Sequence, residues 1–226
     1  MANSEDNRLR RAFREMVARH DSLDASEGVG NVSWVRANLM VPSEAVGGAE
    51  KAVRWAGGTV DILVNNAGIV GAEEFMDVST KTFDDVIAIN TRAPLLVSQV
   101  CLKGMIKQNH GKIVNISSMS SVIAPKAHAS YCASKSGLDG VMRALVSDVS
   151  KHNIQVNNVA PTIAWSDMGI EAWGDPAKSK PMLDRTPLGR FVECWEVANM
   201  VVFLCSDACT MCVGQSICVD GGFTSA

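Results

Sequence analysis

The chain has 226 residues, of which 47% are hydrophobic and 20% charged, and its formal net charge is −3. This length and balance suit a single globular domain with a large core. They offer no basic surface for nucleic acid or an anionic membrane, and no apolar run reaches the roughly 20 residues of a membrane-spanning helix. We therefore expect no nucleic-acid or membrane partner and a cytoplasmic location.

The seven cysteines are scattered singly along the chain. Cys209 and Cys212 form a CxxC pair, but no second pair stands at zinc-binding spacing and no βαβ redox context surrounds them. We interpret the cysteines as reduced thiols of a cytosolic protein and expect no metal site.

Short β-branched runs alternate with longer amphipathic stretches along the whole chain. The pattern predicts helices at 7–20, 43–56, 79–89 running on through 92–108, 130–151 and 194–206. It predicts strands at 32–37, 60–66, 111–118, 154–160 and 216–220. Strands that alternate with helices indicate an α/β fold with a parallel sheet covered on both faces. Segment 162–192, rich in proline and glycine, breaks this rhythm, and we interpret it as a functional loop inserted in the domain.

Ligands bind beyond the carboxyl ends of the strands in open parallel sheets, so the segments that follow the strands are candidates for a binding site. Three such segments carry polar side chains or glycine. They are NNAG (65–68), SSMSS (117–121) and PTIAWSDM (161–168).

Tyr131 and Lys135 stand four residues apart in the stretch SYCASKSGL, so both side chains lie on one helix face. Taken alone, the spacing also fits a buried tyrosine beside a lysine that extends its stem to solvent. With Ser118 after a strand and Asn90 at an expected kink before Pro94, it fits proton-coupled hydride transfer to a carbonyl.

The roles in such a reaction follow from the side-chain chemistry. Tyr131 would donate the proton, and the ammonium of Lys135 would lower the phenol pKa from its usual value of about 10. Ser118 would hold the substrate oxygen where negative charge develops. Lys135 would also reach ribose hydroxyls, and Asn90 would hold a water that relays protons.

Together these segments resemble the short-chain dehydrogenase/reductase family over about residues 30–226. The resemblance is carried by NNAG (65–68), Asn90, Ser118, YCASK (131–135), VNNVAPT (156–162) and GQSICVDGG (214–222). It implies a Rossmann-like doubly wound parallel sheet and a homo-oligomer, either a dimer or a tetramer. It also implies that Asn90, Ser118, Tyr131 and Lys135 form the catalytic set.

The resemblance further implies a nicotinamide cofactor, NADP in preference to NAD. Asn38, where the family commonly has an aspartate, would lie by the adenine, and Asn66, Ala67 and Gly68 by the adenosine half. Near the nicotinamide, the resemblance places Pro161, Ile163 through its backbone, and Ser166, together with Asn90, Tyr131 and Lys135.

Segment 166–191 is similar to the same region of the L-xylulose (dicarbonyl) reductases within the family. This similarity implies a small ketone, an α-dicarbonyl or a ketose such as L-xylulose as substrate. His128 and Trp173 would line the substrate pocket with Ser118 and Tyr131. The alternatives are a solvated loop position for His128 and packing of the loop against the core for Trp173.

One family feature has no counterpart in the sequence. None of the early glycines follows an apolar strand and opens a helix, so the glycine-rich turn that receives the pyrophosphate is missing. We expect residues 1–226 to form a single domain that lacks its first strands and that turn, with an exposed strand edge.

Three interpretations remain open for such a chain. It is a shortened form of a reductase, a non-catalytic scaffold that acts through protein partners, or a reductase with a rebuilt cofactor site. A partner surface would use an apolar stripe of the helix at 130–151, unless that stripe faces the protein's own core. The stripe consists of Leu138, Val141, Met142, Leu145 and Val149.

Overall fold

The computed structural model describes residues 32–226, so the helix expected at 7–20 lies outside the described residues. The described residues fall into two units, 32–37 in the first and Asn38–Ala226 in the second. In the first unit, Val32 forms an isolated bridge and 33–37 has no regular secondary structure. The prediction of a strand at 32–37 is therefore wrong for this structure. A strand forms only where a neighbour satisfies its backbone groups, and hydrophobic alternation alone does not supply that neighbour.

The second unit is built on a parallel sheet of four strands in the order β1-β2-β3-β4. The strands are β1 (Ile62–Asn65), β2 (Gly111–Ile116), β3 (Ile154–Pro161) and β4 (Ser216–Val219). The α/β class is confirmed, as are four of the five expected strands. β1 lies at one edge of this sheet, where Ile62 and Val64 are 48% and 42% exposed.

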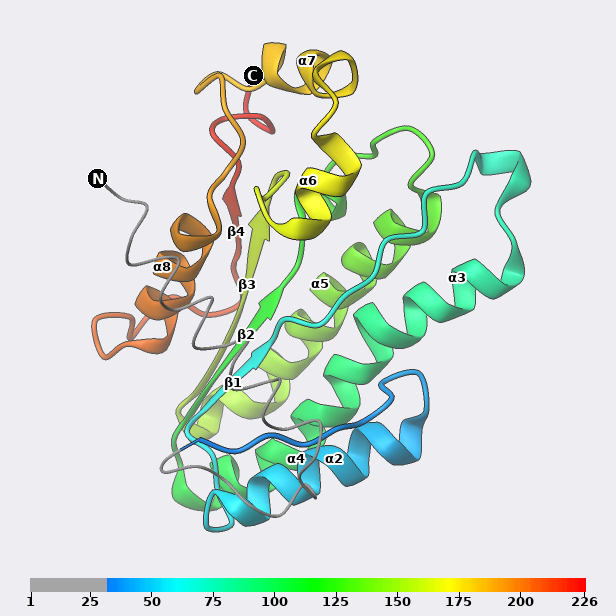
Figure 1. The fold of residues 1–226 in the computed structure, drawn as a ribbon. Coiled ribbons are helices and arrows are strands. Elements are labelled where there is room, and N and C mark those ends of the chain that lie inside the picture. The colour runs from blue at the N-terminus through cyan, green and yellow to red at the C-terminus, as the bar shows by residue number, and fades with distance from the viewer. Residues whose placement is uncertain (1–31) are drawn as a thin grey trace. The chain divides into compact units, whose positions relative to one another are not determined.

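Helices cover both faces of the sheet, as the parallel connections require (Figure 1). α5 packs on β3 and α4 on β2, whereas α8 packs on β2 and β3 from the opposite face. The main helices are α2 (Pro42–Trp55), α3 (Thr80–Ile87), α4 (Ala93–Gln108), α5 (Ala129–Val149), α6 (Asp167–Trp173), α7 (Pro176–Asp184) and α8 (Cys194–Cys205). Short helical turns occupy Phe75–Asp77, Met119–Ser121 and Ser150–His152, and a π-helical turn at Ala88–Arg92 joins α3 to α4.

Segment 162–192 is more regular than its composition suggested, because it contains α6 and α7. The Ser166 hydroxyl accepts from the Gly169 N–H and caps α6. Asp175 caps α7 in the same way by accepting from Ala177, and the proline that follows Asp175 fits the first helical turn. The segment lies beyond the carboxyl ends of β2 and β3 (Figure 1), which is where a substrate loop would be placed.

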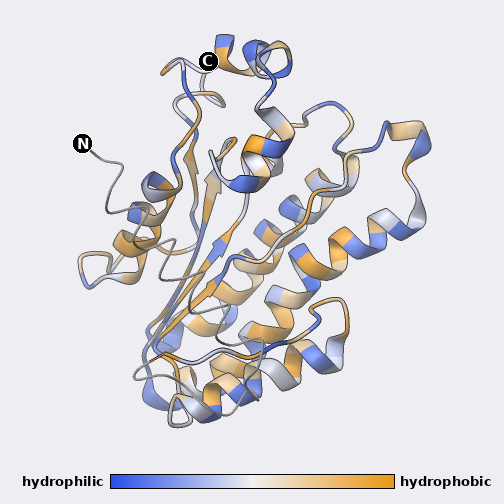
Figure 2. Cartoon of the chain, in the orientation of Figure 1, coloured by the Kyte–Doolittle hydropathy of each residue, from blue (hydrophilic) through white to orange (hydrophobic). Residues whose placement is uncertain are grey.

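The core has two layers because neighbouring residues of a strand point to opposite faces. Ile113 of β2 packs with buried side chains of α4 and α5, and Val114 packs toward α8. Figure 2 shows the corresponding apolar colouring of the strands. The apolar stripe of α5 belongs to this core, since Leu138, Met142 and Val149 are buried. These three side chains are therefore not available to a protein partner.

Among residues 32–226, no helix combines the length and the apolar character needed to cross a bilayer.

The two-layer core makes a testable prediction at Met105, whose side chain is fully buried between α4 and the sheet. Met105→Ala should lower the free energy of unfolding by about 2–5 kcal/mol, because it removes buried apolar atoms and leaves a cavity. Met211, which is 91% exposed, provides the matched control. Met211→Ala should stay within about 0.5 kcal/mol of the parent in urea unfolding. Equal losses for the two variants would contradict this description of the core.

Candidate active site

Ser118 and Tyr131 meet at the carboxyl end of β2. Ser118 lies two residues beyond the end of β2 and Tyr131 lies in the first turn of α5, and the Ser118 side chain is near enough to act on the pKa of Tyr131. Ser118 Oγ also accepts from the Ser120 N–H at 3.1 Å, which fixes the orientation of the serine side chain. The structure thus places these two predicted site residues near each other.

Lys135 lies one helical turn beyond Tyr131 and is almost fully buried. Its Nζ donates to the carbonyl oxygen of Ile116 at 2.7 Å and stands 5.6 Å from the centre of the Tyr131 ring. An ammonium group carries three N–H donors, and one hydrogen bond of this group is found among residues 32–226. Two donors therefore remain for the hydroxyls of a ligand such as ribose.

The electrostatics of this pair differ from the expectation that Lys135 lowers the Tyr131 pKa. Burial raises the pKa of Tyr131, and the hydrogen bond from Ser118 opposes that rise. Burial also lowers the pKa of Lys135 to about 8, against the opposing charge of Asp139. Desolvation disfavours both charged forms, so the phenol is held in its protonated state.

Asn90 lies in the π-helical turn Ala88–Arg92 and is completely buried. Its amide donates to the Ile69 carbonyl at 2.9 Å and to Ser134 Oγ at 3.0 Å, and its Oδ1 accepts from the Ile69 N–H at 2.9 Å. These three bonds tie the loop after β1 to α5. The expected kink before Pro94 is thus present as a π turn, a feature common at functional sites.

Gly68 brings the same loop directly against the site. A Cβ atom added there would lie 3.4 Å from Asn90 Oδ1 and 3.5 Å from Lys135 Nζ. Glycine keeps the space beside the lysine open for a ligand.

A pocket of about 180 Å³ lies on the β1 side of this loop and does not reach Tyr131. It is lined in part by Asn66 and Ala67, which are exposed, and by Leu39. Asn38, next to Leu39, is exposed and its Oδ1 accepts from the Met40 N–H. The pocket therefore takes part of its lining from the loop residues that directly precede Gly68, which lies beside Lys135.

The remaining predicted residues lie after β3 and before α5. Pro161 ends β3 and is buried, and the Ile163 carbonyl accepts from the Val192 N–H. Trp173 is half-buried at the last position of α6. The His128 ring lies edge-on to Tyr131, with 6.4 Å between the ring centres.

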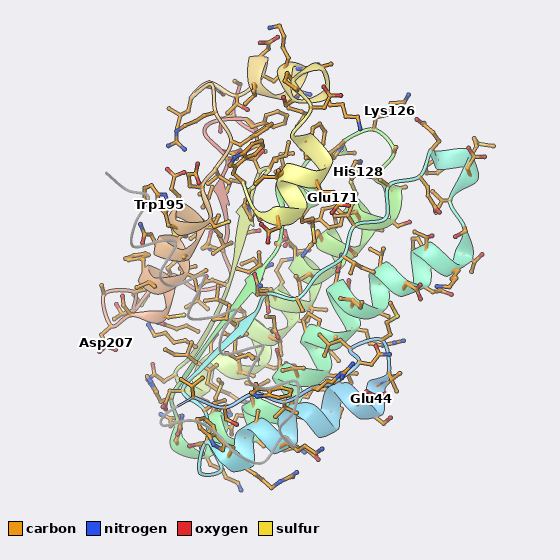
Figure 3. The ribbon with its side chains drawn as sticks, in the orientation of Figure 1. Glu44, Lys126, His128, Glu171, Trp195 and Asp207 are labelled. Carbon is orange, nitrogen blue, oxygen red and sulfur yellow. The ribbon has the colours of Figure 1, made fainter. Side chains whose placement is uncertain are left out.

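Figure 3 places His128, and Glu171 of α6, at the carboxyl end of the sheet. His128 thus belongs to the neighbourhood of Tyr131, whereas the contribution of Trp173 to a substrate pocket stays a prediction.

Two residues of the site were missed by sequence reasoning. Ser134 holds the Asn90 amide and donates to the Tyr131 carbonyl, and Asp139 accepts at 2.8 Å from the hydroxyl of Ser117, which directly precedes Ser118. The helical spacing offered a signal for Asp139, because it follows Lys135 at the same interval that separates Lys135 from Tyr131.

Comparisons with known proteins agree with this geometry. The family described as enoyl-(acyl carrier protein) reductase matches residues 17–224. An L-xylulose reductase of Caenorhabditis elegans is 43% identical over 164 residues, 72% of this chain and 65% of that protein. The chain thus spans slightly less than two thirds of the nematode relative. An L-xylulose reductase of Bos taurus is 39% identical over 197 residues, 87% of this chain and 78% of that protein.

A solved structure shows the same likeness in three dimensions. A gluconate 5-dehydrogenase from Burkholderia cenocepacia, in complex with NADP and tartrate, superimposes with a TM-score of 0.80 at 30% identity. The superposition covers 85% of this chain and 75% of that one. From the extent of the family match, the identities and the shared parallel sheet, we conclude that the chain belongs to the short-chain dehydrogenase/reductase family.

Proposed function

We propose that this protein is an NAD(P)-dependent reductase of small carbonyl compounds, either ketones and α-dicarbonyls or ketoses such as L-xylulose. The observation that carries the proposal is the proximity of Ser118, Tyr131 and Lys135 at the carboxyl end of β2. The likeness to two L-xylulose reductases supports the substrate class. The likeness to an NADP complex supports the cofactor and favours NADP without excluding NAD.

A bound nicotinamide dinucleotide would supply the hydride. The two remaining donors of Lys135 suit the hydroxyls of its ribose, and Gly68 leaves space beside them. Asn66 and Ala67 line a pocket that suits the adenosine half. In this proposal Asn38 adjoins the adenine, and the segment from Pro161 through Ile163 to Ser166 receives the carboxamide.

The protein's own residues would then direct the proton. Ser118 holds the substrate oxygen by a hydrogen bond, and Tyr131 donates its phenol proton to that oxygen as negative charge develops on it. The nearby ammonium of Lys135 stabilises the phenolate that Tyr131 leaves.

Asn90 serves this arrangement chiefly by holding the loop that carries Gly68. Pro94 has no N–H for the Asn90 carbonyl four residues before it, so that carbonyl is the candidate to bind the relay water. His128, which lies beside Tyr131, and Trp173 would contact the rest of the substrate.

The proposed proton donor is tested by Tyr131→Phe, which removes one hydroxyl and keeps the ring. NADPH-dependent reduction of L-xylulose or diacetyl should fall by about 100-fold or more, because the variant lacks the proposed proton donor. Ser136→Ala, at an exposed hydroxyl of the same helix, should leave the rate unchanged. An unchanged melting temperature would show that the fold is kept. Full turnover by Tyr131→Phe would remove Tyr131 from the mechanism.

Because the pKa of Tyr131 is raised, carbonyl reduction and alcohol oxidation should depend differently on pH. Reduction needs the protonated phenol, which burial favours at neutral pH, since the Tyr131 pKa lies above its ordinary value of 10.0. Oxidation of the alcohol needs the phenolate. Its rate should therefore rise steadily from about pH 7 to about pH 10, while reduction changes little around neutral pH. A flat oxidation profile measured with NADP would contradict the assignment.

A further inference from the structure

A buried row of side-chain amides crosses the sheet beneath the site. Asn65, Asn115 and Asn158 are register partners on three neighbouring strands. The Asn65 amide donates to Asn115 Oδ1 at 2.8 Å, and the Asn115 amide donates to Asn158 Oδ1 at 2.8 Å. Asn158 then donates to Asp139 Oδ1 at 2.7 Å. Every amide donates in the same direction, so the row requires a terminal acceptor, and the carboxylate of Asp139 provides it.

Asp139 also holds the end of β2. Its Oδ1 accepts from Ser117 Oγ at 2.8 Å, while Lys135 donates to the preceding Ile116 carbonyl and Tyr131 lies near the following Ser118. Tyr131, Lys135 and Asp139 stand on successive turns of α5. One face of the helix therefore holds Ile116 and Ser117 by hydrogen bonds and presents Tyr131 to Ser118.

We propose that Asp139 is a positioning residue of the reductase site: its carboxylate holds Ser117 so that Ser118 meets Tyr131, and its negative charge stabilises the buried ammonium of Lys135. This inference rests on the proposed function, which gives Ser118 and Lys135 their roles. Asp139 itself touches neither substrate nor cofactor in the arrangement described.

The surroundings of Lys135 make the charge of Asp139 significant. On α5 the titratable groups facing it are Tyr131 and Asp139. The groups beside Lys135 from β2 and from the loop after β1 are neutral, namely the Ile116 carbonyl and Gly68. Burial lowers the Lys135 pKa to about 8, and Asp139 acts in the opposite direction. Within residues 32–226, Asp139 is thus the carboxylate that offsets the desolvation of this ammonium.

Asp139→Asn separates charge from hydrogen bonding. Both donors bind the same oxygen, Oδ1, so an asparagine can keep both bonds while it removes the charge. Asp148→Asn, on the exposed side of α5, is the matched control. The titration of Lys135 is followed by NMR on the cofactor-free protein with 13C-labelled lysine, and Lys135→Gln assigns the resonance.

We expect a Lys135 midpoint near 8 in the parent and in Asp148→Asn. In Asp139→Asn the midpoint should fall by about one pH unit at an unchanged melting temperature. The kcat for carbonyl reduction should fall about 5-fold at pH 8 with little change in KM, and the loss should shrink toward about pH 6, where both proteins keep Lys135 protonated. A merely structural role would not make the loss depend on pH.

An unchanged Lys135 midpoint in folded Asp139→Asn would overturn the inference. So would a parent-like pH profile of kcat. The titration needs no turnover, so an inactive parent with a shifted midpoint in Asp139→Asn would count against the proposed function while supporting the link between Asp139 and Lys135. Asp139→Ala removes the acceptor as well, and its melting temperature should fall below that of Asp139→Asn because Ser117 and Asn158 lose their partner.

Discussion

The buried ammonium of Lys135 is the constraint on which the candidate site depends. A charge taken out of water must be compensated by hydrogen bonds and by opposite charge, and here the Ile116 carbonyl and Asp139 supply them. The compensation is partial, as the lowered pKa of Lys135 shows. Among residues 32–226 the Lys135 ammonium uses one of its three N–H donors, and it lies beside the Tyr131 phenol and Gly68. It is therefore suited to bind a hydroxylated ligand. Packing alone does not account for the free-energy cost of burying the Lys135 ammonium.

The loop after β1 extends the site toward the edge of the described sheet. The Asn90 amide fixes Ile69, and this places Gly68 between the lysine and the pocket lined by Asn66. The sequence contains no glycine-rich turn of the kind that receives a pyrophosphate.

Sequence patterns predicted the sheet and the placing of Ser118 and Tyr131 at one end of it, because strand ends in a parallel sheet converge and helical spacing aligns side chains. They failed where the structure of a segment depends on the residues that pack against it. The segment 32–37 alternates like a strand yet forms none, and segment 162–192 has the composition of a loop yet forms two capped helices. The direction of the Tyr131 pKa shift was also predicted wrongly, because the sequence spacing indicates that Lys135 is near but not how deeply Tyr131 is buried. Asp139 was missed although its helical spacing from Lys135 offered a signal, because its bonds to Ser117 and Asn158 depend on how α5 packs against the strands.

The central claim is that residues of this chain bind a nicotinamide cofactor through Lys135. It is tested most directly by titrating the purified chain with NADPH and with NADH while following nicotinamide fluorescence and melting temperature. The account predicts saturable binding and, at about 100 times the Kd, a melting temperature raised by about 5–10 °C. Binding should be lost in Lys135→Met and kept in Lys103→Met, a change at an exposed lysine. A folded chain that binds neither nucleotide, or a Lys135→Met variant that binds as well as the parent, would contradict the account.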